Sequence, residues 1–241
     1  MTWLEAIPAL TFAALTIVLI GAPFAWAVGA RGITFLALAI GSSVSSVVVS
    51  SFLAPLVGLP WNLGIPFLVS LPLAAIGLLL RRRFVLPPAP GRPREWGTAF
   101  AWSLAAVALG GSLVALSVLP AIGHPDNPSQ TYDAIFHLNA VRWILDTSDA
   151  SPVHMTMSTP AYGTSFYPTP WHAIVAIVVQ LTGAGIVVAS NAVAVATAAF
   201  VWPVASVFLA RALFGPVRLA LVAAGIPVSY THLTLPTNRE V

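Results

Sequence analysis

Long apolar runs alternate with short polar stretches over most of the chain. Several of these runs hold roughly 20 nearly uncharged residues, the length that an α-helix needs to cross about 30 Å of hydrocarbon. The pattern therefore predicts an all-α protein, a polytopic bundle of about six transmembrane helices with a helical loop on its outer side. The predicted spans cover Ala9–Val28, Ile33–Val57, Ile65–Leu80, Ala99–Leu119, a crossing within Trp171–Ala210, and a run that opens near Val217 and breaks off at Pro227.

Trp171–Ala210 leaves two interpretations open. The region forms either two short spans broken near Gly183, or a helix in the outer leaflet over Trp171–Leu181 followed by one crossing over Ile186–Ala210. Arg211 and Arg218 favour the second interpretation, because a single crossing returns these arginines to the cytoplasm.

Three features of the first spans lead to further expectations. Pro23 lies inside the first span, as membrane helices tolerate. The small residues Gly41-Ser42-Ser43 and Ser45-Ser46 suit close helix packing in lipid, with a substrate path as the less favoured alternative. Pro60-Trp61-Asn62 is typical of an interfacial turn, with the Trp61 ring at headgroup depth.

Composition narrows the class of protein. Hydrophobic residues make up 58% of the chain and charged residues 7%, whereas about a quarter of the residues in a soluble domain are charged. The chain has no cysteine, which excludes disulfides and thiolate metal sites. The pI is close to 10.0, but all ten basic residues are arginines in short clusters. Such clusters indicate membrane topology, so the lipid bilayer is an expected partner and nucleic acid is not.

The densest arginine cluster predicts the orientation. Arg81-Arg82-Arg83 precede a proline-rich connector that carries Arg92 and Arg94, and five arginines beside two membrane ends place this connector in the cytoplasm. Alternating spans bring Arg31 to the same side. We therefore expect a multi-pass plasma-membrane protein whose large loop, 120–170, is extracytoplasmic.

The chain divides into three predicted regions. Residues 1–98 hold the first three spans and the cytoplasmic connector, and residues 99–227 hold the fourth span, the outer loop and the following spans. The remainder, Val228–Val241, reads VSYTHLTLPTNREV and interrupts an apolar run that is too short to cross a bilayer. It looks like the translated read-through of a sequencing adapter. We expect this tail to be an artefact and the natural protein to be longer.

Polar chemistry gathers in the predicted outer loop. Four of the five histidines and four of the seven acidic residues lie between positions 124 and 172. From Tyr132 onwards the apolar spacing is helical, and either Asn127-Pro128 or Thr131 caps the start of this helix. Its apolar stripe should lie on the membrane surface or against the bundle.

Two residues four positions apart on this predicted helix, Asp133 and His137, share one face. Asp133 is either a first-turn acid favoured by the helix dipole or a carboxylate that acts as general base or metal ligand. His137 either forms a hydrogen bond with Asp133 or joins it at a divalent metal, although two ligands make a weak motif. Arg142 either binds a phosphate through its forked donors or pairs with Asp146.

The loop ends in a second constellation, Phe166-Tyr167-Pro168-Thr169-Pro170-Trp171-His172. Its aromatic rings are either interfacial anchors or a wall for a sugar or lipid headgroup, with His172 bonding to hydroxyl groups. Asn191, in an apolar helix, is expected to make a packing contact. His124 and His154 are expected to be exposed loop residues.

The run TYDAIFHLNAVRWIL, followed by YPTPWHA, resembles the C-type (GT-C) membrane glycosyltransferases and a group of large actinobacterial membrane proteins related to them. Enzymes of that superfamily are polytopic and transfer sugars from polyprenyl-phosphate carriers, with an acidic motif in the first large exterior loop. The resemblance implies that Asp133 is the catalytic carboxylate, as a base or, with His137, as a ligand of Mg²⁺ or Mn²⁺. In the leading hypothesis, the other candidate residues bind donor phosphate or sugar, namely His137, Arg142, Tyr167, Trp171 and His172.

The resulting hypothesis is an inverting transfer of a sugar from a polyprenyl-phosphate donor to a cell-envelope glycan or protein acceptor, on the extracytoplasmic side. The alternative is a non-catalytic membrane scaffold or a transporter component. A transporter is disfavoured because no acid and no histidine lies inside a span that is predicted without an alternative, whereas ion-coupled carriers commonly place ionisable groups there.

Overall fold

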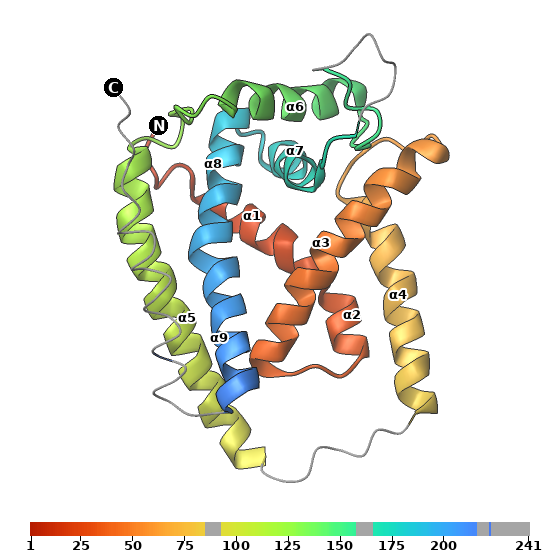
Figure 1. Cartoon of the computed structure of the whole chain (residues 1–241), viewed down its shortest axis with the longest axis vertical. Coiled ribbons are helices and arrows are strands. Elements are labelled where there is room, and N and C mark those ends of the chain that lie inside the picture. The colour runs from red at the N-terminus through yellow and green to blue at the C-terminus, as the bar shows by residue number, and fades with distance from the viewer. Residues whose placement is uncertain (85–92, 158–165, 216–221, 223–241) are drawn as a thin grey trace.

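The computed structural model describes residues 1–84, 93–157, 166–215 and 222, and every regular element in these ranges is a helix, which confirms the all-α class (Figure 1). The elements are α1 (Ile7–Leu19), α2 (Ala22–Ala27), α3 (Gly32–Leu56), α4 (Gly64–Arg83), α5 (Pro93–Ile122), α6 (Ala134–Thr147), α7 (Pro170–Thr182), α8 (Ile186–Ala196), the π-helical η2 (Thr197–Val201) and α9 (Trp202–Phe214).

Four helical segments in the described residues are long and apolar enough to cross a membrane. They are α3, α4, residues Gly97–Ile122 of α5, and the continuous run of α8, η2 and α9 from Ile186 to Phe214. The spans predicted at these places are confirmed as helices. The last predicted run falls outside the described residues except for Val222, and the tail from Val228 lies wholly outside them.

The region after the outer loop, Trp171–Ala210, has the helices that the second interpretation predicts, a short helix followed by a long one. A 13-residue apolar helix, α7, ends at Gly183, whose φ of +68° provides the left-handed cap that glycine adopts without a Cβ penalty. The run of α8, η2 and α9 that follows is one helical segment of 29 residues, long and apolar enough for a single crossing. At 13 residues, α7 is shorter than a crossing requires.

The prediction of one continuous span over Ala9–Val28 is wrong, because the helix breaks at Gly21 between α1 and α2. The Gly21 N–H donates to the Ser43 hydroxyl of α3 (2.7 Å), and the Ser42 hydroxyl donates to the Gly21 carbonyl (3.1 Å). A Cβ at Gly21 would overlap the Ala39 carbonyl. The break is thus held by tertiary hydrogen bonds, and the serines of α3 serve close packing, as expected.

The long final crossing is interrupted by a π-helical turn, η2, a rare conformation in α-helices. This turn packs on α5 at Gly111, where a Cβ would overlap the Ala199 carbonyl. The widened turn and the absent side chain together bring the two helix backbones into direct contact.

Trp61, whose ring was predicted to lie at headgroup depth, is buried inside the protein. Its side chain is only 2% exposed and is the largest fully buried one among the described residues. Its backbone N–H donates to the Ser148 carbonyl (2.8 Å), its Nε1–H donates to the Ala173 carbonyl (3.1 Å), and its own carbonyl accepts from Gln180 Nε2 (3.0 Å). The indole is buried because helices α6 and α7 extend over the turn between α3 and α4 and supply a partner for its N–H.

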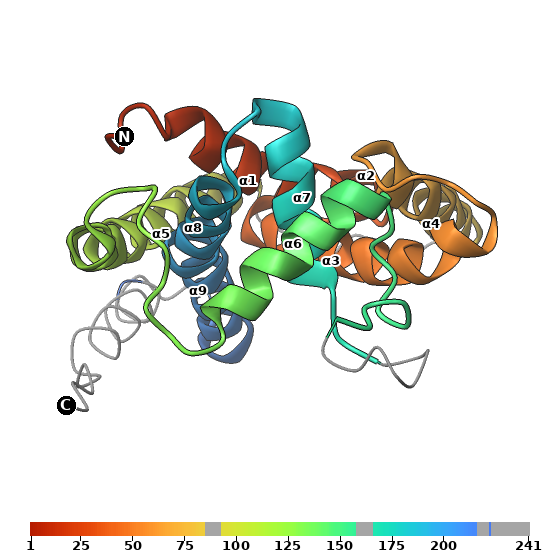
Figure 2. The ribbon, with the colours of Figure 1, turned by 90° about the horizontal axis from the view of Figure 1, so that it is seen from above.

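Helices α6 and α7 lie across one end of the bundle, and α6 crosses over α7 when that end is viewed from above (Figure 2). We call this pair the deck. Ala140, Val141 and Ile144 bury the inner stripe of α6, and an unbroken buried run, Ala173–Val178, fixes α7 in the core. The deck is therefore a rigid part of the fold, and the side chains that it carries are held in place.

The predicted caps of α6 are not used. The helix begins at Ala134, with Asp133 at the N-cap position. Asn127 instead donates from Nδ2 to the Ile122 carbonyl at the end of α5 (3.0 Å). Asn191 makes the expected packing contact, since its Nδ2 donates to the Pro125 and Asn127 carbonyls (2.9 Å each) and ties α8 to this loop.

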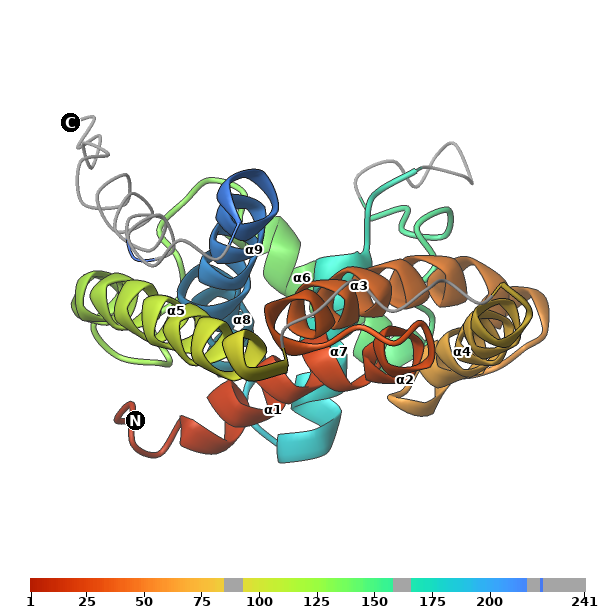
Figure 3. The same cartoon turned by 90° about the horizontal axis from the view of Figure 1, so that it is seen from below.

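Charge divides the two ends of the bundle. The start of α3 and the ends of α4 and α9 all lie at the end opposite the deck (Figures 1 and 3), and they carry Arg31, Arg81, Arg82, Arg83 and Arg211. The prediction that the Arg31 loop and the Arg81 cluster share one side is confirmed. The deck and its loops carry Asp126, Asp133, Asp146 and Asp149.

Candidate functional site

The candidate site begins at the first turn of α6. Asp133 is exposed and its carboxylate forms no capping hydrogen bond, although its backbone occupies the N-cap position. His137, one turn later, does not bond to the Asp133 carboxylate. Its Nδ1 lies 2.9 Å from Nε2 of His172 on α7, and the two imidazoles share a hydrogen bond across the deck.

Aromatic rings surround this histidine pair. The two imidazole planes are nearly parallel, at 23° with centroids 5.2 Å apart. Trp171 stands edge-on to both rings, with centroid distances of 5.9 Å to His137 and 5.1 Å to His172. Tyr167 lies 5.6 Å from His172 and 4.6 Å from Phe136. We call Phe136, His137, Tyr167, Trp171 and His172 the aromatic box; it brings together four of the substrate-binding residues predicted from the sequence.

Two hydrogen bonds to backbone carbonyls hold the box against the end of the outer loop. The Tyr167 N–H donates to the Pro152 carbonyl (2.8 Å), and the buried Thr169 hydroxyl donates to the Ala150 carbonyl (2.6 Å). Pro170 then starts α7, a position where its missing N–H costs nothing. The segment that carries Tyr167, Trp171 and His172 is therefore fixed by hydrogen bonds just before α7 begins.

Burial controls the protonation of His172, whose side chain is 3% exposed. Removal from water, followed by the neighbouring His137, lowers the pKa of His172 to about 4, and the Pro168 backbone carbonyl partly offsets this shift. His172 is therefore neutral at physiological pH. Its Nδ1 is one of the buried polar atoms of the described residues that lack a well-formed hydrogen bond.

Asp133 lies close enough to the box to affect it. Burial raises the pKa of the Tyr167 phenol above its usual value, and the negative charge of Asp133 raises it further. The charge of the exposed Asp133 carboxylate therefore acts on the Tyr167 phenol.

Arg142 stands apart from the box. Its Nε donates to Asp146 Oδ2 at 2.8 Å, one turn along α6, and this hydrogen bond raises the pKa of the guanidinium. Of its two predicted roles, pairing with Asp146 is the one that the structure contains. Both side chains are more than half exposed, so the pair contributes little to stability.

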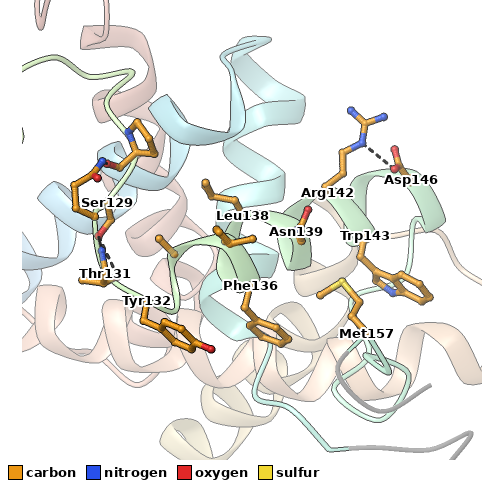
Figure 4. Close-up of a pocket in the computed structure, with 14 residues that line it drawn as sticks. Ser129, Thr131, Tyr132, Phe136, Leu138, Asn139, Arg142, Trp143, Asp146 and Met157 are labelled. Atoms are coloured by element: carbon orange, nitrogen blue, oxygen red, sulfur yellow. Dashed lines mark hydrogen bonds and ion pairs between the residues drawn. The ribbon is translucent and has the colours of Figure 1, made fainter. Parts of the chain in front are cut away.

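An open groove of about 990 Å³ runs along the outer side of α6 (Figure 4). We call it the α6 groove; its lining includes Ser129, Gln130, Thr131, Tyr132, Phe136, Asn139, Arg142, Trp143, Asp146 and Met157. Phe136 belongs to both the groove and the box, whereas His137 and His172 do not line the groove.

Sequence reasoning missed most of the groove residues, among them Tyr132, Phe136, Asn139, Trp143 and Met157. Aromatic residues at 132, 136 and 143 recur at helical spacing, and this is the signal that points to them. Met157 approaches from the loop, so no local pattern could have identified it.

The predicted metal pair is not completed by other side chains. Within the described residues, no group of three or more His, Cys, Asp or Glu comes together that could hold a metal ion. One nitrogen of His137 is already engaged with His172. Side chains alone therefore do not form a divalent-metal site here, and the oxygens of a bound phosphate would have to supply further ligands.

The other loop histidines make local contacts. His154 Nδ1 bonds to Asp149 Oδ2 at 2.6 Å, and His124 Nδ1 lies 3.3 Å from the Met1 carbonyl. Both histidines are exposed, as expected, and neither lies in the box or lines the α6 groove.

Comparison with known protein families identifies a family to which this chain is similar. A model described as a family of unknown function (DUF6541) matches residues 14–238, most of the chain. The chain belongs to this family. No curated protein and no solved structure matches the chain.

Proposed function

We propose that this DUF6541 chain is a glycosyltransferase-like membrane protein of the C-type, which moves a sugar from a polyprenyl-phosphate donor to a cell-envelope acceptor. The observation that carries the proposal is the position of Asp133. This carboxylate is exposed and uncapped, its charge acts on Tyr167 of the box, and its neighbours Tyr132 and Ala134 line the α6 groove. A general base must be accessible to the substrate and must lie beside a preformed binding surface, as Asp133 does.

The proposed reaction is a single displacement. An acceptor hydroxyl oxygen forms a bond to the anomeric carbon of the donor sugar while the bond from that carbon to the phosphate oxygen breaks. The hydroxyl proton passes to the Asp133 carboxylate, and polyprenyl phosphate leaves with the bonding electron pair. Attack from the face opposite the leaving group inverts the anomeric configuration.

The groove and the box provide contacts for the two substrates. Aromatic faces such as those of Phe136 and Trp143 suit sugar rings, and Asn139 offers hydrogen bonds to hydroxyl groups. The Arg142 guanidinium carries the forked donors that bind phosphate, with Asp146 as its partner while the site is empty of donor. In the alternative role of Asp133, its carboxylate would not act as the base but would hold Mg²⁺ or Mn²⁺ together with donor phosphate oxygens.

The distribution of arginine supports an extracytoplasmic site. Arginines flanking membrane helices favour the cytoplasmic side, and three helix ends that carry them lie opposite the deck. Asp133 then faces the exterior of the plasma membrane, where lipid-linked sugars meet envelope acceptors.

The test compares Asp133→Asn with Asp126→Asn in membranes that carry the full chain. Asp126 is a matched control, an exposed carboxylate of the same loop paired only with the N-terminal amine. Transfer of radiolabelled hexose or pentose from synthetic polyprenyl-phosphate sugars to the envelope fraction is measured. Loss of a general base should reduce the rate of transfer by roughly 10²–10⁴-fold in Asp133→Asn, with the control unchanged. Full transfer by Asp133→Asn would favour a non-catalytic scaffold or transporter component instead.

A further inference from the structure

The end of the bundle opposite the deck presents a strongly basic surface, which we call the basic end (Figure 3). Among the described side chains it consists of Arg31, Arg81, Arg82, Arg83 and Arg211. In the part of the chain that the structure describes, no ion pair includes one of these arginines. The described acidic side chains lie at the deck end, in the outer loops and beside the N-terminal amine. They therefore leave the positive charge of the basic end uncompensated.

The turn between α2 and α3 brings two of these arginines together. Gly29 closes the end of α2 with a φ of +82°, and the Ala30 N–H donates to the Ala25 carbonyl (3.0 Å). A Cβ at Gly29 would lie 2.7 Å from the central carbon of the Arg81 guanidinium group. Arg31 follows two residues later, and its Nη1–H donates to the Ala30 carbonyl (2.8 Å). Two guanidinium groups from separate helices thus lie against this one turn.

Most of the hydrogen-bond donors of this pair are available. A guanidinium group has five N–H donors and no acceptor. Arg31 uses Nη1 for the bond to Ala30, Arg81 makes no hydrogen bond within the described residues, and both side chains are exposed. Two like charges at one turn also repel each other, and a bound anion relieves that repulsion. The pair therefore suits phosphate, whose oxygens match the forked donors of arginine.

Exposed apolar side chains lie next to this pair. On α4, Ile76, Leu79 and Leu80 are 51–64% exposed, and Trp26 on α2, which packs against α4, is 60% exposed. Helix α4 is long and apolar enough to cross a membrane, so such side chains suit contact with hydrocarbon. An indole at the end of such a helix is typical of headgroup depth. A molecule bound at the turn would meet charged and apolar surface together.

We propose that the α2–α3 turn and the end of α4 bind an anionic phospholipid, with Arg31 and Arg81 as ligands of its phosphate and the apolar surface of α4 beside its acyl chains. Basic segments are attracted to anionic lipid in general. The turn adds a fixed place where two guanidinium forks meet. This site lies at the opposite end from Asp133 and does not depend on the proposed sugar transfer.

The charge of the basic end selects among phospholipids. A zwitterionic lipid offers the same phosphate, but it carries an ammonium group that the uncompensated arginines repel. An anionic lipid has no such group. A bound phosphate would also connect the α2–α3 turn to the end of α4, so anionic lipid should stabilise the folded protein in proportion to its occupancy.

Native mass spectrometry of the full chain, purified in a neutral detergent, tests the preference. The probes are phosphatidylglycerol and phosphatidylcholine with identical acyl chains. Phosphatidylglycerol should remain bound and should raise the unfolding temperature, whereas phosphatidylcholine should bind weakly and leave that temperature unchanged. Equal retention of the two lipids would overturn the proposal.

Two double variants with the same loss of charge test the position of the site. Arg31→Gln with Arg81→Gln removes both phosphate ligands and should weaken phosphatidylglycerol binding by roughly 100-fold or more. Arg82→Gln with Arg83→Gln is the control, because these residues lie about 100° and 200° around α4 from Arg81. In about 0.15 M salt, which screens charges that are not in contact, the control should lose less than roughly tenfold. Equal losses in the two double variants would show that diffuse charge attracts the lipid, and the proposed site would fall.

A soluble competitor separates a lipid site from a site for free phosphate. Glycerol 3-phosphate carries a phosphate on glycerol but has no acyl chain, so it should not displace phosphatidylglycerol at equal concentration. Displacement under these conditions would assign the turn to a soluble phosphate compound and overturn the lipid as its occupant.

Discussion

The indole Nε1 of Trp61 donates a 3.1 Å hydrogen bond to the backbone carbonyl of Ala173, the residue directly after His172. The turn between α3 and α4 is thereby fastened to the first turn of α7. Trp61, although far from the histidine pair in sequence, thus holds α7, the helix that carries His172.

Replacing Trp61 with Phe should destabilise the protein and loosen α7. The substitution keeps an aromatic ring and removes the buried N–H donor, and losing a buried hydrogen bond costs about 1–3 kcal/mol. Thermal unfolding of the detergent-solubilised protein measures the change. Trp26→Phe is the control, because Trp26 is 60% exposed and its replacement should be nearly neutral. Equal unfolding temperatures for the two variants would contradict a structural role for Trp61.

Gly21→Ala should disturb the junction of α1 and α2. The added methyl group would overlap the Ala39 carbonyl and the Ser42 side chain, and overpacking of this kind typically costs about 1–3 kcal/mol. Gly41→Ala on α3 is the matched control, since a Cβ there meets nothing within 4 Å. Its better helix propensity should leave stability unchanged or raise it by up to about 1 kcal/mol. The stability of both variants is compared by thermal unfolding, and tolerance of Ala at position 21 would disprove the close contact.

Acidification should weaken the fold through His172. The folded-state pKa of about 4 lies below the usual histidine value of 6.5, so the unfolded chain binds the proton more readily and stability falls as pH drops through this window. Between pH 7 and pH 5 this residue should contribute a loss of about 2 kcal/mol. Unfolding temperatures of the unmodified chain and of His172→Gln, measured across the window, give the contribution by difference. Parallel pH profiles would show that His172 is not protected from protonation.

Changing the two members of the exposed ion pair on α6 should shift phosphate binding in opposite directions. Asp146→Asn frees the Arg142 guanidinium and should tighten binding of a short-chain prenyl phosphate, whereas Arg142→Gln should weaken it. Neither change should alter stability measurably, because the pair is solvent-exposed. Microscale thermophoresis with the prenyl phosphate measures both affinities. Weaker binding by Asp146→Asn would count against Arg142 as the phosphate ligand.

Local signals account for the parts of the fold that the sequence predicts well. The helices α3, α4 and α5 are long and apolar enough to cross a bilayer, and the apolar runs behind them predict a helix without reference to distant partners. The long helical segment after α7 also follows from a local signal, the length of the uncharged run that precedes Arg211.

Three features that sequence reasoning missed depend on contacts between distant segments. The break at Gly21 depends on hydroxyl groups of α3. The burial of Trp61 depends on a carbonyl 112 residues away. His137 was expected to bond to Asp133 on its own helix or to share a metal with it, yet its partner lies 35 residues further along the chain. Spacing within a helix cannot reveal which distant group competes for a side chain.

The 29-residue run from Ile186 to Phe214 has a consequence for how a substrate would arrive. At 1.5 Å per residue the helix is about 43 Å long, which exceeds the hydrocarbon thickness of about 30 Å by several turns. Upright, it would lift the deck into the layer of lipid headgroups. A molecule anchored by its own lipid tail would then meet the α6 groove sideways, by two-dimensional diffusion within one leaflet.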